Sequence, residues 1–297
     1  SYAQSFPNTF AWSEGLGFIA DLSDPTKIDY VTYVAAHEFG HQWWAHQIVG
    51  SNQQGMTTLS ETLAQYSALM VMEKKYGRDQ IRRFLKFELD RYLRSRGTER
   101  LEEMPLFRNE NQQYIHYQKG GLVMYLLRDQ IGEDAVNRAL RRVLAQYAFK
   151  GAPYPRSLDL VAALRAEAPA DKQALITDLF EKITLYDVKT TGSTATRRAD
   201  GRWDVTITVD ARKLYADGQG KETDAPLNES FDVGLFSAEP GKGRFNEGDV
   251  ILLERRPIRT GVQTLRFITT KKPSFAGVDP YNKWIDRNSD DNVRTVD

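Results

Sequence analysis

The chain has 297 residues, enough for one large domain or two smaller ones, and 41% of them are hydrophobic, which is too apolar for a disordered chain. Its 40 basic and 40 acidic residues cancel, so the sequence offers no net positive charge for binding nucleic acid. It contains no cysteine, which excludes disulfides, a thiolate metal site and a cysteine nucleophile.

The sequence predicts a soluble domain, because no run approaches the roughly 18 consecutive apolar residues of a membrane span. The first residues also lack the charged and then apolar order of a signal peptide. The chain begins without Met, inside a predicted strand, and we therefore expect a piece of a longer polypeptide. The sequence does not determine the localisation of the protein, and we expect any membrane tether to lie in segments outside this chain.

The first part of the chain is predicted to be mainly helical. From about Thr26 to Glu167, apolar residues recur mostly at helical spacing. The expected helices cover residues 29–49, 59–76, 79–96, 118–131 and 133–147, and then 158–168 and 171–183. The basic residues of the third helix alternate with acidic and apolar ones, which predicts a solvated helix face and no nucleic-acid partner.

After about Tyr186 the hydrophobic pattern changes to a period of two, which is typical of half-buried strands. Strands are expected at residues 203–209, 231–235, 250–255 and 262–269. The predicted fold class is α+β, with a mainly helical domain at residues 1–186 and an all-β sandwich at 187–297.

A possible metal site begins with two of the four histidines, in the sequence His37-Glu38-Phe39-Gly40-His41. On a helix, residues four apart share a face, so both imidazoles can bind one zinc ion. Glu38 is offset by one position and lies beside the ion, where it can take a proton from water. The alternative is a pair of half-buried helix histidines near a salt bridge.

A catalytic zinc also needs a third protein ligand, which in a chain without cysteine is a carboxylate or another histidine. Glu61 comes early in the next predicted helix, and two antiparallel helices joined by a loop at 50–55 would place it opposite the histidines. His46 follows His41 by five residues, so we expect it to face away from the metal.

These motifs resemble the gluzincin zinc metallopeptidases of the membrane alanyl aminopeptidase family. The resemblance rests on His37 to Trp44, on Glu61 with a tyrosine five residues later, and on Tyr117-Gln118-Lys119-Gly120. It implies a thermolysin-like helical domain followed by a β-sandwich, with Zn²⁺ bound by His37, His41 and Glu61. One departure is that 19 residues separate His41 from Glu61, where the family usually has 18.

The resemblance also implies a zinc-dependent aminopeptidase that cleaves the N-terminal bond of a peptide with a free N-terminus. Glu38 is then the general base for the zinc-bound water, and Tyr117 donates a hydrogen bond to the oxyanion, with Tyr114 as a rival for that role. The family's Gly-x-Met-Glu-Asn motif is missing, and residues 10–17 take its place. Glu14 is either the substrate-binding carboxylate or a solvated loop residue.

Two other functions remain open at this point. The first is a zinc hydrolase that acts on blocked or non-peptide substrates, and the second is a non-catalytic zinc-binding scaffold module of a larger membrane protein. Family members carry an N-terminal β domain, so the N-terminal part is expected to be truncated here. Similarity to bacterial members attached to transporter permeases implies a membrane or transporter part outside this chain.

Overall fold

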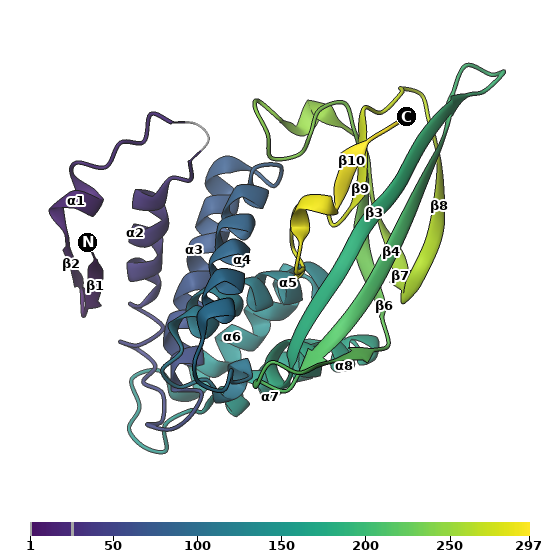
Figure 1. Ribbon diagram of the computed structural model, residues 1–297. Helices are drawn as coiled ribbons and strands as arrows, with labels where there is room; N and C mark the ends of the chain where they lie inside the picture. The colour runs from purple at the N-terminus through teal and green to yellow at the C-terminus, as the bar shows by residue number, and fades with distance from the viewer. Residues whose placement is uncertain (1, 25–26) are drawn as a thin grey trace. The chain divides into compact units, whose positions relative to one another are not determined.

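The computed structural model describes residues 2–24 and 27–297 (Figure 1). Thr26, where the helical part was predicted to begin, lies outside the described residues. The chain divides into two compact units. The first takes in the chain up to Lys75, Phe87–Ile183 and Asp217–Gly220, and the second takes in Tyr76–Lys86, Thr184–Ala216 and Lys221–Asp297. The division into a domain at residues 1–186 and a domain at 187–297 stays a prediction.

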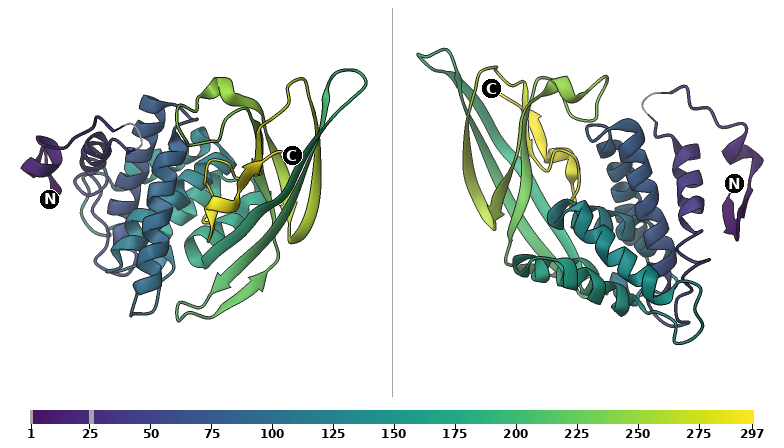
Figure 2. Two further views of the ribbon diagram at one scale, coloured as in Figure 1. Left: turned by 45° about the horizontal axis from the view of Figure 1, so that its top comes forward. Right: turned by 180° about the vertical axis from the view of Figure 1, so that it is seen from behind.

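The first part of the chain is helical, as its apolar spacing predicts. A short antiparallel hairpin comes first, formed by β1 (Ala3–Phe6) and β2 (Thr9–Trp12). The α-helices that follow are α1 (Glu14–Gly17), α2 (Tyr30–Gly40), α3 (Leu63–Tyr76), α4 (Ile81–Thr98), α5 (Gly120–Ile131), α6 (Glu133–Tyr147), α7 (Ser157–Glu167) and α8 (Gln173–Ile176). Both views of Figure 2 show α6 and α7 packed side by side.

Shorter helical turns connect these helices and carry part of the candidate site. Three are π-helical, namely η1 (Thr58–Thr62), η3 (Ile115–Lys119) and η5 (Thr177–Glu181). Two are 3₁₀ turns, η2 (Leu106–Arg108) and η4 (Ala170–Lys172). Turns of the π type are rare and occur often at functional sites, which draws attention to η1 and η3.

Helix α2 is shorter than predicted. Asp29 caps it, because its side chain accepts a hydrogen bond from the backbone N–H of Thr32 at 2.9 Å. The helix was expected to run to residue 49, but it ends at Gly40. Beyond that point Gln42 donates to Ser5 and Phe6 of the β1–β2 hairpin, and such contacts between distant residues are not visible in local periodicity.

The second unit contains two antiparallel sheets. Their strands are β3 (Ile183–Arg197), β4 (Trp203–Ala216), β5 (Glu222–Ala225), β6 (Asn228–Phe236), β7 (Val250–Arg259), β8 (Gly261–Thr269), β9 (Phe275–Val278) and β10 (Val293–Thr295). One sheet has the order β10-β9-β6-β7, and the other has the order β3-β4-β5 with β8 also paired to β4.

The sheet residues confirm the period-two pattern. Val205, Ile207 and Val209 of β4 are almost completely buried, while the residues between them are half-buried. Two further 3₁₀ turns, η6 (Glu247–Asp249) and η7 (Ser289–Asp291), interrupt the loops. The helix predicted at residues 171–183 is wrong at its C-terminal end, because residue 183 already belongs to strand β3, which covers residues 183–197. The α+β fold class is confirmed.

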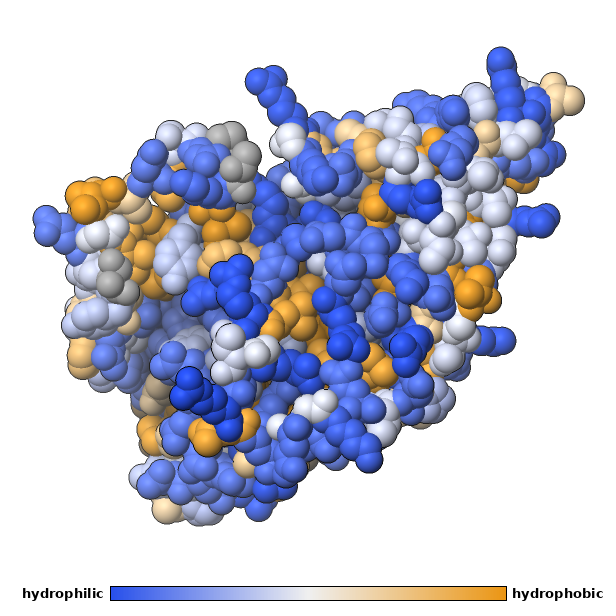
Figure 3. Space-filling model, in the orientation of Figure 1, coloured by the Kyte–Doolittle hydropathy of each residue, from blue (hydrophilic) through white to orange (hydrophobic). Residues whose placement is uncertain are grey.

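The described surface is mainly hydrophilic on the face that Figure 3 shows, where hydrophobic residues form small separate patches. Among the residues that the structure places, none of the helices combines the length and the apolar character needed to cross a membrane.

Candidate metal centre

Three predicted ligands converge at one point of the first unit. The Nε2 atoms of His37 and His41 are 3.0 Å apart, and each lies 3.2 Å from Oε2 of Glu61. Donor atoms around a tetrahedral zinc, with bonds of about 2.0–2.1 Å, are separated by roughly 3.3 Å. Two imidazoles and one carboxylate at this spacing therefore fit the ligand set of a catalytic zinc ion.

The backbone explains why these side chains meet. His37 lies in the last turn of α2, and His41 is the C-terminal cap of that helix with helical backbone angles, so the four-residue spacing is kept. Glu61 lies in the π-helical turn η1. A Cβ atom at Gly40 would be 3.1 Å from Cα of Ala64, so the absence of a side chain at Gly40 lets the two backbones approach closely.

One of the two candidate histidine ligands, His41, has a fixed tautomer. Nδ1 of His41 lies 2.9 Å from the backbone carbonyl oxygen of Trp44, to which it donates a hydrogen bond. That bond leaves the lone pair of Nε2 free to bind a metal. Nδ1 of His37 is buried and has no hydrogen-bond partner among the residues that the structure describes.

The ionised forms of Glu61 and His41 stabilise each other. Burial raises the pKa of Glu61, but hydrogen bonds from His37 and His41 outweigh that effect and hold the pKa far below its usual range. Burial lowers the pKa of His41, but the hydrogen bond to Glu61 and the negative charge of Glu61 outweigh that effect. The pKa of His41 is therefore raised overall. Glu61 is therefore ionised, as a metal ligand must be.

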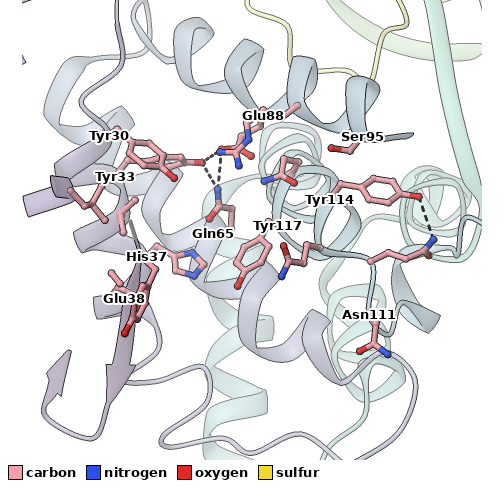
Figure 4. Close-up of a pocket in the computed structure, with 18 of the residues that line it drawn as sticks. Tyr30, Tyr33, His37, Glu38, Gln65, Glu88, Ser95, Asn111, Tyr114 and Tyr117 are labelled. Carbon is pink, nitrogen blue, oxygen red and sulfur yellow. Dashed lines mark hydrogen bonds between the residues drawn. The ribbon is translucent and has the colours of Figure 1, made fainter. Parts of the chain in front are cut away.

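Glu38 is buried and, like His37, is one of the residues that line the cavity drawn in Figure 4. Burial raises the pKa of its carboxyl group, and the nearby charges of His37 and His41 and the backbone N–H of Ser5 partly offset that increase. Ser5 belongs to β1, so the hairpin contributes a donor to Glu38. A carboxylate with a raised pKa suits a group that accepts and returns a proton.

Tyr117 lies on the π-helical turn η3, with its ring 5.5 Å from the ring of His37. Burial, the charge of Glu61 and a hydrogen bond to Glu61 all raise the pKa of the Tyr117 hydroxyl. The phenol therefore stays protonated and available as a hydrogen-bond donor. Tyr114, the alternative candidate for the oxyanion hydrogen bond, also lines the cavity, but its hydroxyl is directed toward Gln112.

His37, Glu38 and Tyr117 line a cavity of about 720 Å³. The hairpin, α1, α2, α3, α4 and the segment at 111–118 contribute the other walls. Figure 4 shows Tyr33, Gln65 and Glu88 on one side of this cavity. Sequence reasoning missed these three residues, although Tyr33 and Gln65 are each four positions from a predicted ligand and so share its helix face.

Neither Glu14 nor the buried His116 is among the described residues that line the cavity. Glu14 is exposed at the start of α1 and is not among the described residues that line the cavity, so its substrate-binding role stays a prediction. His116 is buried beside Tyr117, and its Nδ1 accepts a hydrogen bond from Asn109 at 2.8 Å. Burial lowers the pKa of His116 to about 4, so this imidazole is neutral.

Comparisons with known proteins identify a family for more than half of the chain. Residues 18–181 match the Peptidase family M1 domain. Aminopeptidase A of Legionella pneumophila, solved in complex with aspartic acid, has the same fold at 16% identity and a TM-score of 0.50 over 85% of this chain and 26% of that one. No curated protein matches the sequence.

A second solved structure is an M1 zinc metallopeptidase mutant of Deinococcus radiodurans, bound to a Tyr-Ser-Ala substrate. It is 19% identical, with a TM-score of 0.40, over 50% of this chain and 32% of that chain. The present chain thus spans about a quarter to a third of the length of these two proteins.

Proposed function

This chain belongs to peptidase family M1, and on that premise we propose that it is a zinc-dependent aminopeptidase domain. The family assignment confirms the resemblance seen in the motifs, and it implies Zn²⁺ as the cofactor. One observation carries the proposal, namely that the donor atoms of His37, His41 and Glu61 converge within 4.8 Å of one another. Glu38 and Tyr117 flank that point on one cavity.

Each residue has a distinct task in the proposed reaction. His37, His41 and Glu61 would hold the zinc ion, which would supply Lewis-acid chemistry and lower the pKa of a water molecule to near neutral pH. Glu38 takes a proton from the attacking water and later delivers it to the leaving amine. Tyr117 donates a hydrogen bond to the oxyanion that develops on the scissile carbonyl.

The proposed substrate is a peptide with a free N-terminus. A zinc hydrolase that accepts blocked or non-peptide substrates is the second candidate, and the exposed position of Glu14 outside the described cavity wall favours it. Both candidates use the same metal centre and the same base, so they differ only in how the substrate is recognised.

Two measurements on the purified chain test the proposal. Metal analysis should find one zinc per chain, and an aminoacyl anilide should be cleaved far faster than its N-acetylated form. Equal cleavage of the two anilides would favour the second candidate, and zinc without any hydrolysis would favour a scaffold module. Glu38→Gln should keep zinc and lose activity by orders of magnitude, so unchanged turnover would remove Glu38 as the base.

A further inference from the structure

A second polar contact joins the two ligand-bearing segments, one helical turn away from the metal ligands. Tyr33 precedes His37 by four residues on α2, and Gln65 follows Glu61 by four residues on α3. Residues four apart share a helix face, so Tyr33 and Gln65 lie on the same faces as the ligands. Nε2 of Gln65 donates to the Tyr33 hydroxyl oxygen at 2.8 Å, so this pair repeats the meeting of His37 with Glu61.

Glu88 of α4 completes the contact. Its Oε1 accepts hydrogen bonds from the Tyr33 hydroxyl at 2.9 Å and from Nε2 of Gln65 at 3.0 Å. The three side chains therefore form a closed set of hydrogen bonds between three helices, as Figure 4 shows. Glu88 is fully buried, and Tyr33 and Gln65 are nearly so.

A buried glutamate at such a position carries a desolvation penalty. Burial raises the pKa of Glu88 to about 7, against the opposing effects of Tyr33, Arg91 and Gln65. Its second oxygen, Oε2, is also buried, and a side-chain hydrogen bond from Gln118 adds to the effects that oppose the rise in pKa. An apolar residue of similar volume would pack α4 against its neighbours without this desolvation cost, so helix packing alone does not explain a carboxyl group here.

A closed set of directional bonds can do what apolar packing cannot, because it fixes how far one helix slides or rotates against another. The distance from His37 to Glu61 depends on that register, since the two ligands come from different elements. Outer-shell groups that orient metal ligands typically change metal affinity by 10–100-fold when they are removed.

We propose that Tyr33, Gln65 and Glu88 form a positioning clasp, here called the Glu88 clasp, which holds α2 and α3 in the register that brings the three metal ligands together. The three clasp residues line the same cavity as His37, and the proposal gives them no direct bond to the metal. This inference rests on the proposed function only for the identity of the metal, and it concerns zinc affinity and not turnover.

The test compares two tyrosine variants that make the same chemical change. Tyr33→Phe removes a hydroxyl that donates to buried Glu88, whereas Tyr125→Phe removes a hydroxyl that donates to buried Glu73, on the far part of α3. The dissociation constant of Zn²⁺ is measured by competition with a chelator on the full chain. We expect Tyr33→Phe to bind zinc at least 10-fold more weakly and Tyr125→Phe to bind it within 2-fold of the original chain.

Two substitutions of Glu88 separate positioning from packing. Glu88→Gln keeps an oxygen that accepts from Tyr33 and Gln65, so its zinc affinity should stay within a few-fold of the original chain. Glu88→Leu keeps the volume and loses the acceptor, so it should bind zinc as weakly as Tyr33→Phe. The visible spectrum of bound Co²⁺, which reports ligand geometry, should change in Glu88→Leu and stay unchanged in Glu88→Gln.

Clear results would overturn the inference. If Tyr33→Phe and Tyr125→Phe lose similar thermal stability and both keep the original zinc affinity, the clasp only packs helices. The same conclusion follows if Glu88→Leu folds and gives an unchanged Co²⁺ spectrum, and Tyr33→Phe decides the matter if Glu88→Leu does not fold. Since zinc affinity is measured without substrate, the clasp can stand even where the chain proves to have no peptidase activity.

Discussion

Gly120→Ala is expected to destabilise the protein, because Gly120 touches the turn that carries Glu61. Gly120 begins α5 directly after the turn that carries Tyr117. A Cβ atom at this position would lie 2.2 Å from Oγ1, 2.8 Å from Cγ2 and 3.0 Å from Cβ of Thr62. Thr62 is fully buried, and its hydroxyl donates to the carbonyl oxygen of His116 at 2.6 Å, so it cannot rotate away without losing that bond.

The size of the effect follows from three contributions. Overpacking a core contact costs about 1–3 kcal/mol, and weakening the buried Thr62 hydrogen bond costs about 1 kcal/mol more. Alanine is the better helix former by about 1 kcal/mol, which offsets part of the loss. The free energy of unfolding should therefore fall by roughly 1–3 kcal/mol, which denaturant unfolding followed by circular dichroism can measure.

A matched control is available within the chain. Gly97 lies inside α4, and a Cβ atom there would meet nothing within 4 Å, so Gly97→Ala should be neutral or stabilise by up to about 1 kcal/mol. Thr62→Ala removes Oγ1 and Cγ2, so Gly120→Ala should cost less in that background than in the original chain. If Gly120→Ala behaves like Gly97→Ala, the close approach of α5 to the Glu61 turn is not as described.

Three further perturbations have definite expected outcomes. Tyr117→Phe should lower kcat/KM by about 10²–10³-fold and leave zinc content unchanged, and a smaller loss would speak against Tyr117 as the oxyanion donor. Removal of zinc by a chelator should lower the melting temperature, since zinc at about 1,000 times its dissociation constant stabilises by about 4 kcal/mol, and an unchanged melting temperature would argue against the site. Burial raises the pKa of Asp286 from 3.8 to about 7, so the folded protein holds this proton more tightly than the unfolded chain and stability should fall as pH rises between those values. Asp286→Asn has no carboxyl group to ionise here, so its free energy of unfolding should not show this decrease. The free energy of unfolding of the variant minus that of the original chain should therefore rise by on the order of 4 kcal/mol from pH 4 to 7. Parallel pH profiles of the two proteins would contradict the assignment.

The three candidate metal ligands were accessible to sequence reasoning because their arrangement is largely local. The spacing of His37 and His41 fixes both imidazoles on one side of α2, even though the helix ends at Gly40, since His41 keeps helical backbone angles. Glu61 was suggested by its place early in the next helix, and the family motif supported that choice. The alternation of Val205, Ile207 and Val209 identified strand β4 for a similar reason, because side-chain direction in a strand repeats every two residues.

The amino-acid sequence by itself thus determined the α+β class and the pattern of the metal-binding motif, since both follow from periods of two to four residues. The tertiary structure alone decided where α2 ends, which residues surround the cavity and that Glu14 lies outside the described cavity wall. It also brought Glu88 to Tyr33 and Gln65 across 55 and 23 positions of the chain. Such contacts depend on how helices pack, and packing is set by the shape and burial of many side chains at once.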